Sequence, residues 1–234
     1  PIVIRVFFGE DEYLEGVNLT GESFYTMLSV AESLPKTAQI TPVEFEERIA
    51  PHIEAGDEVV ILPISKELSG TYNNALIAAS QFPEGRVHVV DTCHVTFSLA
   101  LMVYEAVALR DAGRTGAQIA AAMAELSPKI RLYAVIDDLK YLKLGGRLSS
   151  AGAMVGTLLG VKPLITISEG KVVNIAKARG LKAGYSFIAE KIKAEADLRR
   201  RMTSGHSRCP DRREEMLDTC KPCMPGVTLH RCDI

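Results

Sequence analysis

The sequence lacks an apolar segment long enough to cross a membrane. Its longest apolar-rich helix candidate covers about 150–161, whereas a spanning helix needs about 20 residues. It also shows no N-terminal segment in which charged residues precede an apolar run, the pattern of a secretory signal. From both absences we expect a cytoplasmic location and no stable membrane insertion.

Cysteine is scarce, with five residues among 234. An odd number of cysteines argues against a disulfide framework and for a reducing compartment. A surplus of one charge is also missing, because 27 Lys and Arg stand against 29 Asp and Glu, a formal net charge of −2. These totals give no reason to expect nucleic acid or an anionic membrane as a partner.

Internal repeats and low-complexity linkers are absent too, and 47% hydrophobic with 24% charged residues is typical of a soluble globular protein. The first part of the chain alternates strand and helix patterns, which indicates an α/β layer on a mainly parallel sheet. We therefore expect an N-terminal α/β domain over 1–128. Its strands are expected at 2–8, 58–64 and 87–91, and its helices at 20–34, 41–54, 70–81, 95–112 and 115–126.

After residue 128 the pattern changes to that of an α+β domain, expected over 129–234. A hairpin is predicted where two apolar strands flank the turn 168–170. A short helix stops at Gly145-Gly146. The remaining elements predicted here are a strand at 130–136 and helices at about 150–160, 182–201 and 214–219.

Residues 64–75, ISKELSGTYNNA, place four hydroxyl side chains around one glycine, directly after an apolar run. In an open parallel sheet, ligands bind at the carboxyl ends of strands, and a helix N-terminus favours a carboxylate or phosphate. Ser69 and Thr71 add hydroxyl donors, and Gly70 lets a ligand approach the backbone. The same residues also fit a helix with Ser69 as its N-cap and no ligand.

Thr37 and Gln39 lie in the segment KTAQITP, which leads into a capping box at Thr41. They could face the same ligand as Ser69, or form a plain connecting loop. In YLKLGGRLSS, residues 141–150, the Gly-Gly pair directs Arg147 out of a tight turn. The glycines that follow, spaced four apart, suit either close helix packing or the passage of an apolar chain: Gly152, Gly156 and Gly160.

Two C-terminal features carry weaker signals. Cys220 and Cys223 form a CKPC segment at the end of a predicted helix, the wrong end for a redox motif, and their spacing to His230 matches no standard zinc module. We interpret them as incidental thiols. The arginines of 199–213 fit a solvated surface or, alternatively, a docking site for an acidic protein.

Four segments in order resemble the DegV family of bacterial lipid-binding proteins. The matches are LSGTY at 68–72, YLKLGGRLS at 141–149, LLGVKPL at 158–164 and KARGLKA at 177–183, which are similar to the family's LSGTY, YLKKGGRIS, LLxIKPIL and KxRxxKKA. The resemblance implies a two-domain fold that holds one long-chain fatty acid between its domains. The tail would occupy an apolar tunnel, and the carboxylate would lie among hydroxyl groups.

The family also implies a role as the acyl-binding, non-catalytic subunit of fatty acid kinase. A separate ATP-binding kinase subunit would convert the presented carboxylate to an acyl phosphate. On this sequence the carboxylate ligands implied are Ser69 with Gly70, and Thr37 as their companion. The basic residues Arg147, Arg179 and Lys182 are candidates for docking the kinase or facing the phosphate. No cofactor, metal or catalytic residue is expected.

The sequence departs from the family pattern in several places. Ala38 and Ile40 replace a serine and a proline of the family's TTSQPS loop, and residues 91–96 read DTCHVT where the family has DSxxxS. The sequence starts after the family's first strand and its DST motif, and ends before its THxGPG motif. We therefore expect an incomplete head-group site. A stand-alone phosphotransferase or hydrolase stays open as an alternative, although only Lys66 and Glu67 offer a base near Ser69.

Overall fold

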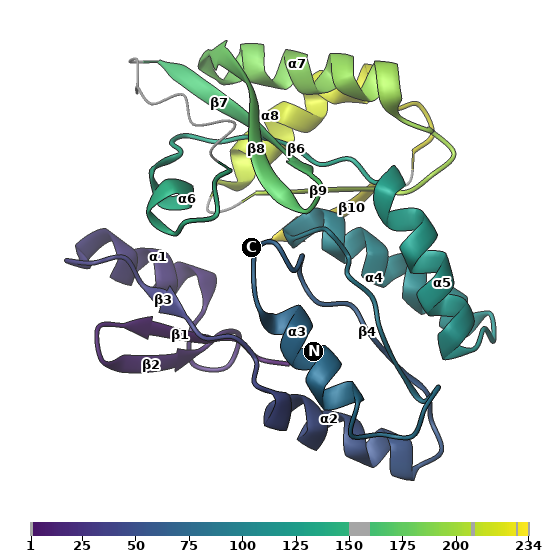
Figure 1. The fold of residues 1–234 in the computed structure, drawn as a ribbon. Helices are drawn as coiled ribbons and strands as arrows, with labels where there is room; N and C mark the ends of the chain where they lie inside the picture. Colours follow the sequence, from purple (N-terminus) through teal and green to yellow (C-terminus); the bar gives the residue numbers. More distant parts are fainter. Residues whose placement is uncertain (1, 150–159, 207–208, 228, 234) are drawn as a thin grey trace. The chain divides into compact units, whose positions relative to one another are not determined.

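The computed structural model describes residues 2–149, 160–206, 209–227 and 229–233. The chain forms two compact units, Pro1–Ile130 and Arg131–Ile234, each with its own hydrophobic core (Figure 1). Residues 150–159 of the predicted helix over 150–160, and with them Gly152 and Gly156, lie outside the described residues.

In the first unit, two parallel strands separate two pairs of helices. β4 (Val59–Ile61) pairs with β5 (Val87–Val89). Because side chains alternate along a strand, Val59 and Ile61 pack on one helix pair while Val60 and Leu62 pack on the other. The first pair is α2 (Pro42–Glu54) and α3 (Thr71–Ala79), and the second is α4 (Thr96–Asp111) and α5 (Gly116–Leu126).

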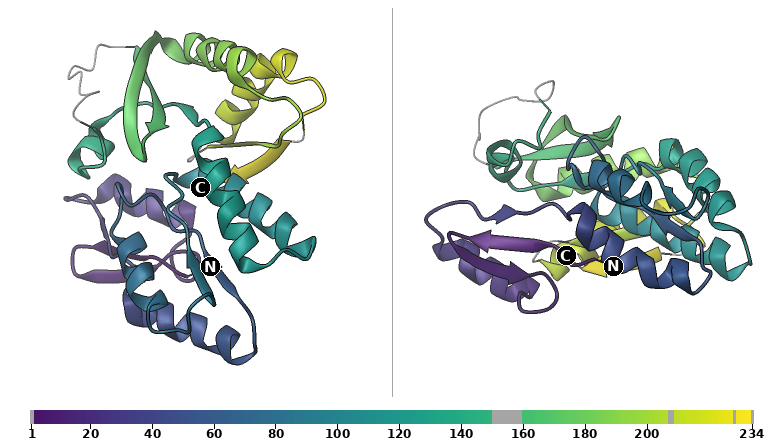
Figure 2. Two further views of the ribbon diagram at one scale, coloured as in Figure 1. Left: turned by 45° about the vertical axis from the view of Figure 1, so that its right-hand side comes forward. Right: turned by 60° about the horizontal axis from the view of Figure 1, so that its bottom comes forward.

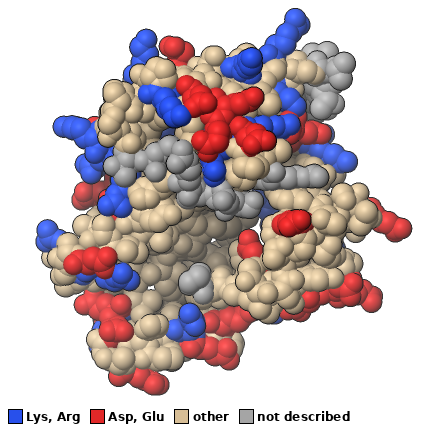
Figure 3. Space-filling model, turned by 180° about the vertical axis from the view of Figure 1, so that it is seen from behind, with Lys and Arg blue, Asp and Glu red and all other residues tan. Residues whose placement is uncertain are grey.

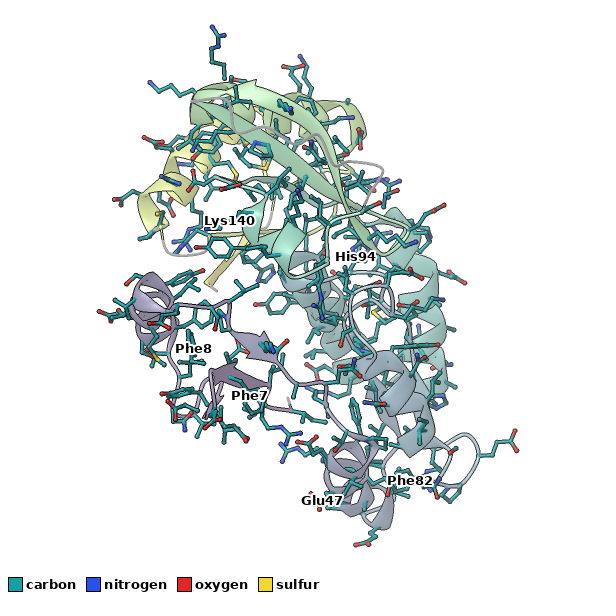
Figure 4. All side chains as sticks on the ribbon, turned by 60° about the vertical axis from the view of Figure 1, so that its left-hand side comes forward. Phe7, Phe8, Glu47, Phe82, His94 and Lys140 are labelled. Atoms are coloured by element: carbon teal, nitrogen blue, oxygen red, sulfur yellow. The ribbon has the colours of Figure 1, made fainter. Side chains whose placement is uncertain are left out.

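A second sheet in this unit is antiparallel, a feature that the sequence did not predict. Its strands are β1 (Arg5–Phe8), β2 (Asp11–Leu14) and β3 (Lys36–Thr37), in the order β2-β1-β3. α1 (Gly21–Val30) adds an aromatic contact, since the ring of its Phe24 lies 5.7 Å from that of Phe8, which is labelled in Figure 4. β2 and β3 escape prediction because they are short and mostly polar, so burial leaves no pattern on them.

The second unit is built on an antiparallel sheet of β6 (Tyr133–Val135), β7 (Val161–Ser168) and β8 (Lys171–Arg179). α7 (Gly180–Glu195) runs along this sheet (Figure 2), and its Ile188 and Ala189 pack with Leu164 in the core. α8 (Pro210–Cys220) joins the same core through Cys220. The unit also contains α6 (Lys140–Leu144) and two strands in parallel, β9 (Met202–His206) and β10 (Leu229–Asp233).

Local signals in the sequence predict several boundaries correctly. Thr41 accepts a hydrogen bond from the Glu44 N–H at 3.3 Å, and the Glu44 carboxylate accepts from the Thr41 N–H at 2.7 Å, which is the predicted capping box. The predicted hairpin turn contains Glu169 and Gly170 at φ 49° and 77°, the left-handed pair typical of a type I′ turn.

The helix predicted over 182–201 is too long. α7 begins at Gly180 and ends at Glu195, because Ala196 already has extended backbone angles. Asp197 then accepts hydrogen bonds from the backbone and side chain of Arg199, which stabilises a turn instead of further helix. The sequence does not reveal this helix end because polar residues with good helix propensity continue past it.

The capping box of α2 provides a test of these local contributions. Thr41→Ala removes the acceptor for the Glu44 N–H, so we expect the free energy of unfolding to fall by about 1 kcal/mol in urea denaturation. Thr26→Ala is the control, because the Thr26 hydroxyl only bonds a carbonyl of its own helix. Equal stability of the two variants would contradict the capping role.

Candidate functional site

The segment Ser65–Thr71 forms a hydroxyl-lined turn between β4 and α3. The Ser69 Oγ accepts a hydrogen bond from the Thr71 N–H at 3.3 Å and lies 2.9 Å from the Thr71 Oγ1. The N-cap of α3 is Gly70, whereas the sequence suggested Ser69. The difference arises because the Ser69 oxygen binds the N–H only two residues ahead, which closes a small turn before the helix begins.

This turn has the chemistry of an anion site. The N–H groups of the first turn of a helix have no partner within the helix and carry partial positive charge. The hydroxyls of Ser69 and Thr71 lie at that end of α3. Donors of both kinds therefore gather where a carboxylate could accept hydrogen bonds.

The loop after β3 comes directly against this turn. A Cβ built on Gly70 would lie 2.4 Å from the Gln39 Oε1 and 2.8 Å from its Nε2, so only glycine leaves room for that amide. The Asn74 Nδ2 donates to the Ile40 carbonyl at 2.8 Å and holds the loop on α3. Thr37 lies two residues before Gln39, in β3, with an exposed side chain.

A buried polar layer connects the loops after β4 and β5. The Thr92 hydroxyl, fully buried, donates to the Pro63 carbonyl at 2.6 Å and accepts from the His94 N–H at 3.2 Å. Ser127 donates its hydroxyl to the Thr92 carbonyl at 2.7 Å. Nε2 of His94, labelled in Figure 4, lies 3.0 Å from the Ser127 carbonyl.

Sequence reasoning missed these roles of Thr92, His94 and Ser127. In the sequence, residues 91–96 keep the hydroxyl groups of the family's DSxxxS segment but exchange its serines. The available signal was the run of polar residues directly after an apolar strand, which repeats the arrangement after β4. Polar side chains are costly to bury unless they are hydrogen-bonded, so such a run predicts a network rather than a loop in solvent.

The candidate basic residues lie in the second unit at two places. Arg179 is the last residue of β8 and Lys182 lies in the first turn of α7, and both are exposed. Arg147 follows Gly146, whose φ of 70° allows the turn that ends α6. The Arg147 guanidinium donates to the Gly145 carbonyl, a contact that folds it back on this turn.

Of the two cysteines, Cys220 has the environment expected of an inert thiol. α8 ends at Cys220, as predicted, so the thiol lies at the wrong end of the helix for activation. Burial, followed by the nearby Cys223, raises the pKa of the Cys220 thiol to about 11. Within 2–149, 160–206, 209–227 and 229–233, no three His, Cys, Asp or Glu side chains gather into a possible metal site. Nor does any helix in these ranges have the length and apolarity to cross a membrane.

Several known proteins resemble this chain. A DegV domain-containing protein of Deinococcus radiodurans is 36% identical over 192 residues, which cover 82% of this chain and 68% of that protein. A DegV family protein from Thermus thermophilus, whose structure is described as showing fatty acid binding, is 30% identical. It has a TM-score of 0.88 over 99% of this chain and 84% of its own.

A more distant likeness shows the fold alone. The fatty acid kinase B3 protein of Streptococcus pneumoniae, solved with linoleic acid, has a TM-score of 0.88 at 18% identity, over 99% of this chain and 83% of its own. These matches confirm the α/β fold expected from the sequence. The sequence model of the family described as "Uncharacterised protein, DegV family" matches residues 2–234. The chain therefore belongs to the DegV family.

Proposed function

We propose that this chain binds a long-chain fatty acid and holds its carboxylate at the N-terminus of α3. The observation that carries the proposal is the turn at Ser69 and Gly70, where hydroxyl and backbone donors converge and the Gln39 amide lies close by. Thr37, two residues from Gln39, is the proposed companion ligand. Fatty acid binding by the related Thermus thermophilus protein supports the same ligand class.

The tail and the carboxylate of such a ligand contribute differently to its free energy of binding. Each methylene removed from water contributes about 0.8 kcal/mol, so an apolar tunnel for a long tail provides most of the affinity. A carboxylate brought out of water is costly unless several donors replace the lost water. The donors at Ser69 and the α3 N-terminus would meet that requirement and would also select an acid over other lipids.

The finer proposal is that this chain is a non-catalytic carrier without a cofactor, which presents the carboxylate to a separate ATP-binding kinase subunit. Its fold is that of the Streptococcus pneumoniae fatty acid kinase B3 protein. Residues 131–234 contain 19 Lys and Arg against 11 Asp and Glu, a formal charge of +8, whereas residues 1–130 contain 8 against 18, or −10.

This excess of positive charge favours an anionic partner or phosphate at the second unit, where Arg147, Arg179 and Lys182 lie. Many other basic side chains are already beside acids, as the face in Figure 3 shows. Arg212 and Lys162, for example, both bind Asp137 at 2.6 Å. Arg179 and Lys182, exposed at the β8–α7 junction, are therefore the better candidates for docking.

Ser69→Ala tests the carboxylate site. Loss of a hydrogen bond to a charged group should weaken palmitic acid binding by about tenfold to a hundredfold in a titration followed by native mass spectrometry. Ser80→Ala, at the other end of α3, is the matched control because its hydroxyl donates to the Ile77 carbonyl and accepts from the Gln81 amide, away from the helix N-terminus. Unchanged affinity in Ser69→Ala would remove Ser69 from the site.

Gly70→Ala tests the close approach of Gln39. A methyl group at Gly70 would displace the Gln39 amide, which is the flexible end of its side chain, so stability should change little. We expect palmitic acid affinity to fall by about threefold to tenfold because the donors are rearranged. If Gly70→Ala binds as the wild type does, the position of the Gln39 amide is irrelevant to the ligand.

Arg179→Glu tests the docking proposal in an assay with an ATP-binding fatty acid kinase subunit. Charge reversal should reduce acyl phosphate formation by about tenfold and leave palmitic acid binding unchanged. Lys193→Glu lowers the charge of the same unit equally, near the other end of α7, and serves as the control. Equal turnover of the two variants would argue against docking at Arg179.

A further inference from the structure

Asp91 follows β5 and connects two loops through one carboxylate. Its Oδ1 accepts hydrogen bonds from the Cys93 N–H at 3.0 Å and from the Lys66 N–H at 3.4 Å. Its Oδ2 lies 3.3 Å from the Lys66 ammonium. The Asp91 side chain is only 14% exposed, so these contacts are partly shielded from water.

The backbone around this carboxylate is strained. Cys93 and Thr96 have φ angles of 52° and 50°, in the left-handed region that a residue with a side chain seldom adopts and that is costly for a β-branched threonine. Strain of this kind persists only where surrounding contacts stabilise it. The Asp91 bond to the Cys93 N–H is one such contact, and the buried Thr92 hydroxyl provides others.

The strained loop determines where Ser69 lies. The Ser65 N–H donates to the His94 carbonyl at 2.9 Å, and the Ser65 carbonyl in turn accepts from the N–H groups of Leu68 and Ser69 at 3.0 and 3.1 Å. Asp91 binds Lys66, the residue directly after Ser65. The turn that carries the Ser69 hydroxyl is thus held in place by hydrogen bonds from Ser65 and Lys66 to residues 91–94.

We propose that Asp91 is a positioning residue for the fatty acid carboxylate site. It holds the loops after β4 and β5 together, so that the Ser69 hydroxyl faces the ligand in one fixed place, and does not itself touch the ligand. This inference rests on the proposed function, but its structural part concerns the chain without any ligand.

The chemistry of Asp91 favours this indirect role. A second carboxylate in contact with that of a fatty acid would repel it, whereas here both oxygens of Asp91 are bound to Lys66 and Cys93. The Lys66 ammonium also offsets the negative charge, and the hydrogen bond with Asp91 raises the pKa of Lys66. The pair therefore adds little net charge near the site.

The first arm of the test is amide hydrogen exchange on the ligand-free chain. Asp91→Ala should increase exchange of the Leu68 and Ser69 amides by about tenfold, because the turn is released. Asp91→Asn retains one oxygen that can accept from the Cys93 N–H and should restore most of the protection. Asp111→Ala, an exposed aspartate at the end of α4, is the control. Unchanged protection in Asp91→Ala would overturn the proposal.

The second arm compares palmitic acid with hexadecan-1-ol, which has the same tail but no carboxylate. Asp91→Ala should weaken palmitic acid binding by about tenfold and leave alcohol binding within about twofold. Equal losses for both ligands would show a general structural role and overturn the proposal. If the wild type binds neither lipid while exchange at Ser69 still responds to Asp91, the proposed function fails and the positioning of the turn stands.

Discussion

The buried hydrogen bonds between the loops after β4 and β5 are the constraint on which the candidate site depends. Thr92, without exposure to solvent, joins the Pro63 carbonyl to the His94 backbone, and the His94 carbonyl holds Ser65. These bonds are shielded from water, so breaking one would leave a polar group buried without its partner. The turn at Ser69 is therefore defined by the loop of another strand as much as by its own residues.

The layer behind these loops explains why they can meet. β4 and β5 run in parallel, so their carboxyl ends lie at the same edge. Val59 and Ile61 pack toward α2 and α3, while Val60 and Leu62 pack toward α4 and α5, and burial on both faces leaves the strands little freedom to shift register. A rigid layer of this kind can hold polar loops at its edge and still tolerate strained residues such as Cys93.

The two units of the chain differ in charge more than the total suggests. A net charge of −2 conceals −10 over residues 1–130 and +8 over residues 131–234. The anion site proposed at α3 lies in the acidic unit, where local donors rather than overall charge must attract a carboxylate. The basic unit contains the residues proposed to meet the kinase subunit or the phosphate, for which a broad positive field is suited.

The sequence by itself determined those features that depend only on interactions between neighbouring residues. The capping box at Thr41, the start of α5 at Thr115, the hairpin turn at Glu169-Gly170 and the stop of α6 at Gly145 all follow from neighbouring residues, and each was predictable. The hydroxyl-rich segment around Ser69 was also visible, together with its resemblance to the DegV family.

Only the tertiary structure decided which of these segments meet. That Gln39 occupies the space over Gly70, and that Asp91 binds Lys66 across 25 positions of sequence, depends on strand pairing and on bonds between loops. The strands β2 and β3 and the end of α7 at Glu195 were equally hidden. Both strands are too short and polar to show a burial pattern, β3 also pairs with a distant segment, and α7 ends at a turn that competes with good helix formers. Local patterns record what a segment prefers, whereas a site is made where packing brings several segments together.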